Sequence, residues 1–224
     1  MVCLSGNTFY YHMDKLQQLR QEFIKAQLDT DNLNSDPFTQ FRYWFNDAVK
    51  AIHTDANAMM LATADQDGKP SARVLLLKGF DQNGFTFFTN YESKKGQQLA
   101  INPYATIVFY WKELERQVRV EGRVDKTSRK ESDDYFNIRP EGSRIGAWTS
   151  PQSKPIPDRH YLDRLQQDLS RLFSSKPLER PENWGGYRLM PNLFEFWQGR
   201  ENRLHDRFEY KLEKGEWIIR RLAP

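Results

Sequence analysis

The stretch AMMLATADQDGKPSARVLLLKGFDQNGFTFFT, residues 58–89, alternates apolar runs with turn residues. Ala58–Ala64, Ser71–Phe80 and Phe85–Thr89 have the length and the β-branched and aromatic content of strands. Asp81–Gly84 joins the last two runs and ends in Asn-Gly, a pair favoured in two-residue hairpins. Short strands joined by tight turns predict an antiparallel barrel or sandwich rather than a parallel sheet.

The same kind of pattern continues on both sides of this stretch. Further strands are predicted over Tyr104–Trp111, Arg116–Val124, Gly186–Met190, Leu193–Trp197, Arg207–Leu212 and Trp217–Leu222. Helices, recognised by apolar residues three or four apart, are predicted over Met13–Leu28, Pro37–Ile52, Ser93–Ile101, Ser128–Ile138 and Asp158–Phe173. No repeat or linker interrupts the pattern. We therefore predict a disordered segment over residues 1–12 and one α+β domain over residues 13–224, an antiparallel Greek-key-like barrel with flanking helices.

Composition excludes several classes of protein. The 224 residues include 33 Lys and Arg against 30 Asp and Glu, so there is no overall basic excess that would predict a nucleic-acid partner. The single cysteine, Cys3, excludes an intramolecular disulfide, and the four histidines are too scattered for metal-ligand spacing. The sequence has no apolar run of about 20 residues and no signal-peptide pattern. These features predict a cytoplasmic protein with no metal site and no membrane partner.

Several common catalytic motifs are also missing from the sequence. There is no glycine-rich dinucleotide motif, no phosphate loop, no Gly-x-Ser-x-Gly and no His-Glu-x-x-His. This disfavours Rossmann enzymes, nucleotide triphosphatases, common esterases and zinc proteases. The function must be sought in clusters of cations and aromatic residues.

Two clusters of cations are candidates for holding an anion. Lys94 and Lys95 lie at the start of a predicted helix. A cation there interacts unfavourably with the helix dipole and destabilises the helix by roughly 0.3–1 kcal/mol. An anion held by both lysines and the exposed N–H groups would reverse that sign, and a solvated run of charges is the alternative. Arg73 and Lys78 flank an apolar run, either as charges that protect a core strand or as two ends of an anion site.

The stretch EFWQGRENRLHDR, Glu195–Arg207, combines aromatic residues with cations. If the chain is extended from Arg203, side chains alternate, and Arg203, His205 and Arg207 share one face beside Trp197. Such a face suits a flat anionic aromatic ligand, because Arg offers phosphate a planar fork of donors and stacks on rings, while His titrates near neutral pH. The alternative is a solvated strand edge protected by charges.

Two further groups of residues have both a structural and a functional interpretation. Gln117, Arg119 and Glu121 alternate onto one face of a predicted strand, which is either solvated or covered by a ligand whose heterocycle edge Gln117 binds. Tyr135 and Arg139 lie four apart on a predicted helix and would share a face, where Tyr can stack and Arg can pair with phosphate.

Eight ordered blocks of the sequence resemble the pyridoxine/pyridoxamine 5′-phosphate oxidase family. They are Arg73-Val-Leu-Leu-Leu-Lys78, Phe88-Thr-Asn90, Arg116-Gln-Val118, Tyr135-Phe-x-x-Arg-Pro140, Trp184-Gly-Gly186, Glu195-Phe-Trp-Gln-Gly199, Asn202-Arg-Leu-His-Asp-Arg207 and Arg221-Leu-Ala-Pro224. The resemblance runs from about Arg20 to the last residue. Its most specific blocks are Arg-Leu-His-Asp-Arg and the Arg-Leu-Ala-Pro ending.

The resemblance implies an FMN-binding split β-barrel that forms a homodimer, with an FMN site at each of two places on the subunit interface. Members of the family oxidise pyridoxine or pyridoxamine 5′-phosphate to pyridoxal 5′-phosphate. Hydride passes from the substrate C4′ to flavin N5, and O2 reoxidises the flavin to give H2O2. With the amine substrate, water releases ammonia from the imine.

The resemblance also implies site residues by position. FMN would be held by Arg73, Val74, Leu75, Leu76, Lys78, Phe88, Thr89, Lys94, Lys95, Gln117, Gln152, Ser153, Trp197 and Arg207. The substrate would meet Lys78, Tyr135, Arg139, Ser143, Arg203, Leu204, His205 and Arg20, and Arg203 and His205 would be the catalytic residues.

The sequence departs from the family pattern at two of these regions, and two other functions remain as alternatives. Lys94 stands where many members have Arg, and Phe23 where some bacterial members have Tyr. One alternative is a split-barrel protein that binds FMN or heme without oxidase activity, which would not need the substrate residues. The other is a barrel that binds single-stranded nucleic acid, which needs a basic stripe that the balanced charge disfavours.

Overall fold

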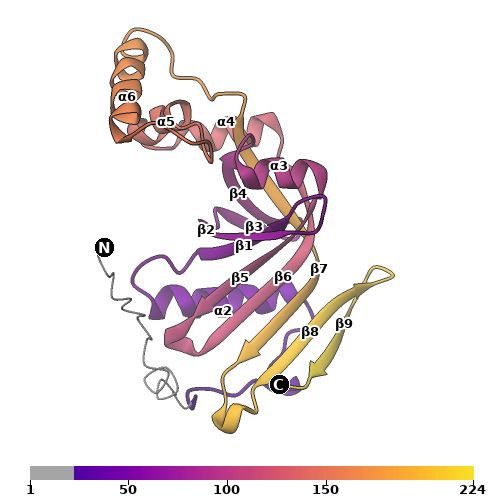
Figure 1. Ribbon diagram of the computed structural model, residues 1–224. Helices are drawn as coiled ribbons and strands as arrows, with labels where there is room; N and C mark the ends of the chain where they lie inside the picture. The colour runs from indigo at the N-terminus through magenta and orange to yellow at the C-terminus, as the bar shows by residue number, and fades with distance from the viewer. Residues whose placement is uncertain (1–22) are drawn as a thin grey trace, which may run out of the picture.

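The computed structural model describes residues 23–224 (Figure 1). Over these residues the chain forms one antiparallel sheet of β1 (Ala58–Ala64), β2 (Pro70–Leu76), β3 (Gly79–Asp81), β4 (Gly84–Asn90), β5 (Tyr104–Trp111), β6 (Arg116–Lys126), β7 (Trp184–Gln198), β8 (Asp206–Glu213) and β9 (Glu216–Leu222). The α-helices are α2 (Pro37–Ala51), α3 (Lys94–Ile101), α4 (Arg129–Asn137), α5 (Glu141–Thr149) and α6 (Arg159–Phe173). This confirms the predicted α+β class. Within residues 23–224, no helix is long and apolar enough to cross a membrane.

The sheet curls because β2 and β3, which are joined directly, lie at opposite ends of the strand order β2-β1-β5-β6-β7-β4-β3. The Leu77 N–H donates to the Asn57 carbonyl next to β1 (2.9 Å), whereas the Lys78 N–H donates to the Thr86 carbonyl of β4 (2.9 Å). The prediction of one strand over Ser71–Phe80 is therefore wrong, since the chain changes pairing partner within it. The same two bonds bring the ends of the sheet together, as the predicted barrel requires.

Strand β7 is one long strand where two were predicted. Its first half pairs with β4, its second half pairs with β8, and its other edge pairs with β6 from Tyr187 to Gln198. Pro191 interrupts the sequence pattern because proline has no N–H to donate. The pairing with β6 shifts register opposite Glu121 and Gly122, where Asn192 of β7 has no partner, and this bulge lets the strand continue past Pro191.

Helix α2 lies within the curl of the sheet and supplies part of its core (Figure 1). It begins as predicted, since the Asp36 carboxylate accepts a hydrogen bond from the Thr39 N–H (2.9 Å) and Pro37 occupies the first turn. Phe41 is fully buried, with ring centroids 4.9 Å from Phe85 and 5.1 Å from Phe109. These aromatic contacts fasten the helix to the strands that carry the candidate site.

Two helix predictions need correction. Residues 23–28, the described end of the helix predicted over Met13–Leu28, are not helical; the rest of it, with Arg20, lies outside the described residues. Backbone N–H groups there bond to distant side chains instead, Lys25 to Glu115 (3.1 Å) and Leu28 to Asp206 (3.1 Å). Helix α5 was not predicted, and it starts directly after Pro140, whose carbonyl accepts from the first turn.

Candidate functional site

A group of cations and hydroxyls at the start of α3, which we call the anion cradle, is centred on Lys95. The side chain of Lys95 is buried, and its Nζ donates to Thr89 Oγ1 (3.1 Å), Ser93 Oγ (3.2 Å) and Gln152 Oε1 (3.0 Å). All three acceptors are neutral. Burial, and secondarily the nearby Arg73, lowers the pKa of Lys95 to about 8. A lysine this buried without a negative partner is rare unless a ligand supplies the charge.

Arg73 on β2 is the second cation of the anion cradle. Its guanidinium donates to the Leu61 carbonyl (3.1 Å), Thr63 Oγ1 (2.7 Å) and Ser71 Oγ (2.6 Å). Burial lowers the pKa of Arg73 as well. Within the part of the chain that the structure describes, neither Arg73 nor Lys95 forms an ion pair. Two neighbouring cations with neutral partners create a strong preference for an anion at this place.

The two lysines at the start of α3, which look alike in the sequence, differ in burial in the structure. Lys95 points into the fold, whereas Lys94 is exposed at the first position of α3. Ser93 caps the helix through its side chain. The exposed N–H groups of this helix start favour an anion on the same side as the cradle.

Phe88, Tyr135 and Trp184 form an aromatic wall on the face of β4 opposite to Thr89 of the anion cradle, because successive side chains of a strand point to opposite faces. The rings of Phe88 and Tyr135 stack with centroids 3.9 Å apart, and Trp184 lies parallel to Tyr135 at 6.2 Å. The Arg139 guanidinium lies 4.5 Å over Trp184. Helix α4 ends before Arg139, so Tyr135 and Arg139 meet on Trp184 rather than on one helix face.

Arg139 has unused hydrogen-bonding capacity in this wall. Its Nη1 atom is buried and has no hydrogen-bond partner among residues 23–224, and burial lowers its pKa. A buried donor without a partner is costly, so it indicates a missing acceptor. Ser143 lies exposed on α5 shortly after Arg139, and Gln152 and Ser153 lie in the following loop. Ser153 has a positive φ of 72°.

A second group of predicted residues surrounds Trp197 near the end of β7. The His205 ring lies 4.6 Å from Trp197, and Phe23 packs edge-on against both rings at 5.7 Å. His205 Nδ1 accepts a hydrogen bond from the Arg200 N–H (3.1 Å). In the neutral ring the proton is therefore on Nε2, which makes that nitrogen a donor. Burial and then Arg203 lower the pKa of His205, while Asp206 opposes them.

Glu195 holds the cations of this second group in place. It is buried, and it accepts from Arg207 Nε (2.9 Å) and Arg119 Nη2 (2.5 Å). Burial alone would raise the pKa of Glu195, but the hydrogen bonds from Arg207 and Arg119 hold it below its usual value. Arg207 also donates to the Ala223 carbonyl (2.7 Å). Gln117 pairs with Trp197 in register, so the predicted polar face of β6 belongs to this group.

The prediction that the chain is extended from Arg203 is wrong. Residues Glu201–Arg203 form a 3-10 turn in which Asn202 and Arg203 have φ values of 55° and 61°. The strand begins only at Asp206. His205 and Arg207 still share a side, since both lie at Trp197, whereas Arg203 and Leu204 are exposed on the turn. The turn is held by the Arg200–His205 bond and by the Leu204 N–H to the Glu201 carbonyl (3.1 Å).

The two groups lie far apart in one chain. Trp184 of the aromatic wall and Trp197 of the second group are near opposite ends of β7, thirteen residues apart, which in extended strand is roughly 40 Å. Figure 1 shows the same separation, with α5 and α6 at one end of the molecule and β8 and β9 at the other. A single copy of the chain does not bring all the predicted site residues together.

An exposed apolar face runs across β2, β1 and β5 between the two groups. Val74 (64% exposed) pairs with Met60 (48% exposed), which pairs with Val108 on β5. Leu76 at the end of β2 and Tyr110 on β5 are also exposed, and Leu75 is partly buried. Contiguous exposed apolar residues of this kind mark an interaction surface. Lys78 is exposed just beyond it.

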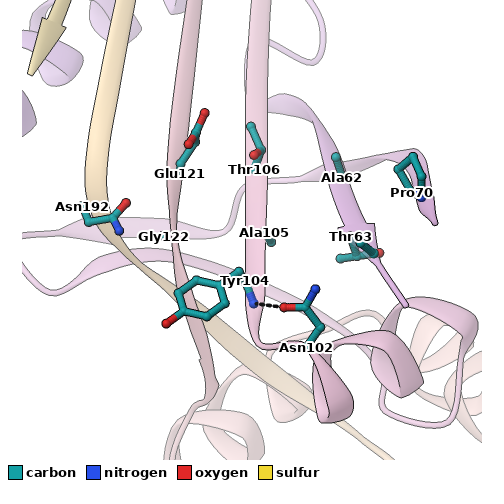
Figure 2. Close-up of a pocket in the computed structure, with 11 residues that line it drawn as sticks. Ala62, Thr63, Pro70, Asn102, Tyr104, Ala105, Thr106, Glu121, Gly122 and Asn192 are labelled. Carbon is teal, nitrogen blue, oxygen red and sulfur yellow. Dashed lines mark hydrogen bonds between the residues drawn. The ribbon is translucent and has the colours of Figure 1, made fainter. Parts of the chain in front are cut away.

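A hollow of about 330 Å3 opens at the edge of this face, between β1, β5 and β6 (Figure 2). Its floor includes small residues such as Ala62, Ala105 and Gly122. Figure 2 shows the Tyr104 ring between the side chains of Asn192 and Asn102. None of the predicted site residues lines this hollow, so we do not assign the site to it.

Sequence reasoning missed the partners that fix the predicted cations. Thr63 and Ser71 accept hydrogen bonds from Arg73 and donate to Gln98, while Glu195 accepts from Arg207 and the Arg200 N–H donates to His205. The available signal was weak. Thr63 is a polar residue in an apolar strand, and Glu195 is an acid between two aromatic residues of a strand.

Comparisons with known proteins agree on one family. A family model described as "Pyridoxamine 5'-phosphate oxidase" matches residues 45–165, and one described as "Pyridoxine 5'-phosphate oxidase C-terminal dimerisation region" matches residues 184–224. The chain is 54% identical over 212 residues to the pyridoxine/pyridoxamine 5′-phosphate oxidase of Polynucleobacter asymbioticus, covering 95% of this chain and 100% of that protein. It is 54% identical over 211 residues to the protein of the same name from Pseudomonas paraeruginosa, covering 93% and 98%.

A solved structure shares the fold across most of the chain. PhzG from Burkholderia lata 383, in complex with tetrahydrophenazine-1-carboxylic acid, superposes with a TM-score of 0.83 at 31% identity. The match covers 89% of this chain and 98% of that one. A second, a pyridoxamine 5′-phosphate oxidase-related, FMN-binding protein from Nostoc punctiforme, has a TM-score of 0.68 at 20% identity over 86% and 100% of the two chains, which supports the fold alone.

Proposed function

The chain belongs to the pyridoxine/pyridoxamine 5′-phosphate oxidase family of oxidoreductases, and from that premise we propose its reaction. It oxidises pyridoxine or pyridoxamine 5′-phosphate to pyridoxal 5′-phosphate. FMN is the cofactor, and O2 is the electron acceptor and is reduced to H2O2. The observation that carries this proposal is the anion cradle. A buried lysine at a helix start and a partly buried arginine beside it, both with neutral partners, are what a cofactor phosphate needs. Flavin supplies the redox chemistry, so the chain needs no nucleophile of its own.

The proposal assigns the FMN phosphate to Lys95, Arg73 and Lys94. Lys95 supplies a buried charge, Arg73 supplies a planar fork of donors, and Lys94 adds an exposed charge. The other proposed FMN contacts are Val74, Leu75, Leu76, Lys78, Phe88, Thr89, Gln117, Gln152, Ser153, Trp197 and Arg207.

The substrate phosphate is assigned to Arg139 together with Tyr135, Ser143 and Lys78. The unpartnered Nη1 of Arg139 supports this, since a phosphate oxygen is the acceptor that it lacks. Arg203 and His205 would hold the pyridine ring. Because His205 Nδ1 already accepts from the Arg200 N–H, its Nε2–H is a donor that can orient the substrate, and it is not a free base.

We propose that each site forms between two copies of the chain. Residues 184–224 match a dimerisation region, which supports a homodimer. The anion cradle with the aromatic wall would come from one copy, and Trp197, His205 and Arg207 from the other. The separation of these groups along β7 and the exposed apolar face between them support this arrangement.

The purified protein is expected to be yellow and to release H2O2 when given pyridoxine 5′-phosphate in air. Acid or heat should release the chromophore, because the proposed contacts include no residue that would bond FMN covalently. A protein that binds FMN but forms no H2O2 would be the flavin carrier of the alternative hypothesis. A colourless protein that takes up no added FMN would contradict the cofactor assignment.

FMN binding to the apo protein is expected to weaken above pH 8. The pKa of Lys95 is about 8 without ligand, and the proton that it then loses is the one the phosphate requires, so Kd should rise by up to about tenfold per pH unit. The FMN phosphate, with a second pKa near 6, stays fully ionised over this range. Fluorescence titration of FMN at pH 7, 8 and 9 measures the effect.

The stability of the apo protein should change in the opposite direction. The pKa of Lys95 is lower in the folded protein than the ordinary lysine value of 10.5, so the unfolded chain binds more protons between pH 8 and 10.5. This residue therefore makes the apo protein more stable as pH rises through that window. Lys95→Arg is the matched control, since Arg keeps its proton. If Kd rises equally in that variant, Lys95 is not the titrating group.

A further inference from the structure

Gln98 of α3 lies behind the anion cradle and makes an unusual set of contacts. Its side chain is buried, and its Oε1 accepts hydrogen bonds from both Thr63 Oγ1 (2.6 Å) and Ser71 Oγ (2.8 Å). Thr63 and Ser71 face each other across the pairing of β1 with β2. One amide oxygen therefore ties a helix to two strands.

These two bonds determine what the hydroxyls can offer to Arg73. A hydroxyl has one proton, so a proton given to Gln98 leaves only oxygen lone pairs for other partners. Arg73 Nη1 donates to Thr63 Oγ1 (2.7 Å), and Arg73 Nη2 donates to Ser71 Oγ (2.6 Å). The whole chain of bonds points one way, from Arg73 through the hydroxyls to Gln98. It fixes the guanidinium by two contacts.

None of these partners carries a charge. Glutamate has the same length as glutamine and could accept the same two protons, but it would place a negative charge within two hydrogen bonds of Arg73. That charge would compensate the guanidinium in the free protein and would repel an incoming phosphate. Glutamine provides the same geometry and leaves the positive charge of Arg73 available.

We propose that Gln98 is a positioning residue for cofactor binding: through Thr63 and Ser71 it orients Arg73 while leaving its charge uncompensated for the cofactor phosphate. The inference rests on the proposed function, which places that phosphate in the anion cradle. A purely structural role for Gln98, in which it only joins α3 to the strands, makes a different prediction for stability. Changes in charge at this position can separate the two.

The test compares Gln98→Glu with Gln98→Leu in the full-length protein. Gln98→Glu should raise the Kd for FMN by about tenfold or more and leave the melting temperature of the apo protein unchanged or higher, because Arg73 gains a partner. Gln98→Leu should lower the apo melting temperature, because two buried hydroxyls lose their acceptor, and should weaken FMN binding less. Only in Gln98→Glu, therefore, should FMN affinity fall while the apo melting temperature stays the same or rises.

Two results would overturn the inference. One is an unchanged FMN affinity in Gln98→Glu, and the other is a loss of apo stability in Gln98→Glu as large as that in Gln98→Leu. If Gln98→Glu does not fold, Ser71→Asp gives the same test from the partly exposed edge strand β2, with the same expected signs.

Inorganic phosphate separates this inference from the proposed function. If the wild-type protein binds no FMN, the proposed function fails. The inference then still predicts that phosphate raises the melting temperature of the wild type and does so less in Gln98→Glu. If phosphate stabilises both proteins equally, the inference is wrong whatever the cofactor is.

Discussion

Replacing Lys95 with glutamate is expected to weaken FMN binding by about two to three orders of magnitude. Lys95 is buried, and within residues 23–224 its Nζ has only neutral hydrogen-bond partners. The proposed cofactor phosphate would be its partner of opposite charge. Breaking a buried charge pair costs roughly 3–5 kcal/mol, and here the new charge would also repel the ligand. The apo protein should tolerate the change better, because the new carboxylate would lie near the unpaired Arg73.

The measurement is an FMN titration of each apo variant together with its apo melting temperature. Lys94→Glu, one residue earlier but exposed, should weaken binding far less, because solvent screens its charge. Lys176→Glu, on an exposed loop, is the control for net charge and should bind as the wild type does. If Lys94→Glu and Lys95→Glu lost FMN affinity equally, the burial of Lys95 would not be what makes it important for phosphate binding.

Replacing Arg203 with leucine is expected to lower kcat/KM for pyridoxine 5′-phosphate by on the order of 100-fold while FMN content stays normal. The proposed role of Arg203 is to hold the substrate ring at the flavin, and small misplacements of a reacting carbon have effects of this size. Arg203 is exposed on the 3-10 turn and has no ion-pair partner within residues 23–224. The fold should therefore survive the change.

Two further variants test how Arg203 and His205 share the work. Arg203→Lys keeps the charge and loses the planar fork, so its activity should fall between those of the wild type and Arg203→Leu. His205→Asn should be milder than Arg203→Leu, because Asn keeps a donor. Steady-state rates and the flavin spectrum are measured on the same preparation. A normal kcat/KM in Arg203→Leu with full flavin would remove Arg203 from the active site.

Local signals in the sequence predicted those elements that local interactions determine. The observed bounds of β1 are those predicted, and α2 starts at the predicted cap Asp36 and Pro37. The break between β2 and β3 was missed because it depends on hydrogen bonds from Leu77 to Asn57 and from Lys78 to Thr86, which no local pattern encodes. Two strands were predicted in place of β7, but β7 continues past Pro191 because Asn192 bulges out of the pairing with β6.

For the candidate site, the sequence predicted the residue types better than their geometry. Lys94 and Lys95 look alike in sequence, and only the packing of α3 buries one of them. The left-handed conformation of Arg203 could not be expected either, whereas Asn202 is a residue type that suits a turn and tolerates this conformation. The contacts of His205 and Arg207 with the residues around Trp197 follow from strand pairing across β7 and β8 and from the turn before β8.

The length of β7 has a consequence for how activity depends on protein concentration. If each site draws one half from either end of this strand in two different copies, an isolated chain carries two half-sites and no complete one. Activity per chain then follows mass action, and it falls when dilution dissociates the pair. By the same logic, two inactive variants, each defective in a different half, restore one working site when they assemble together. In genetic terms the locus would show complementation between its own alleles.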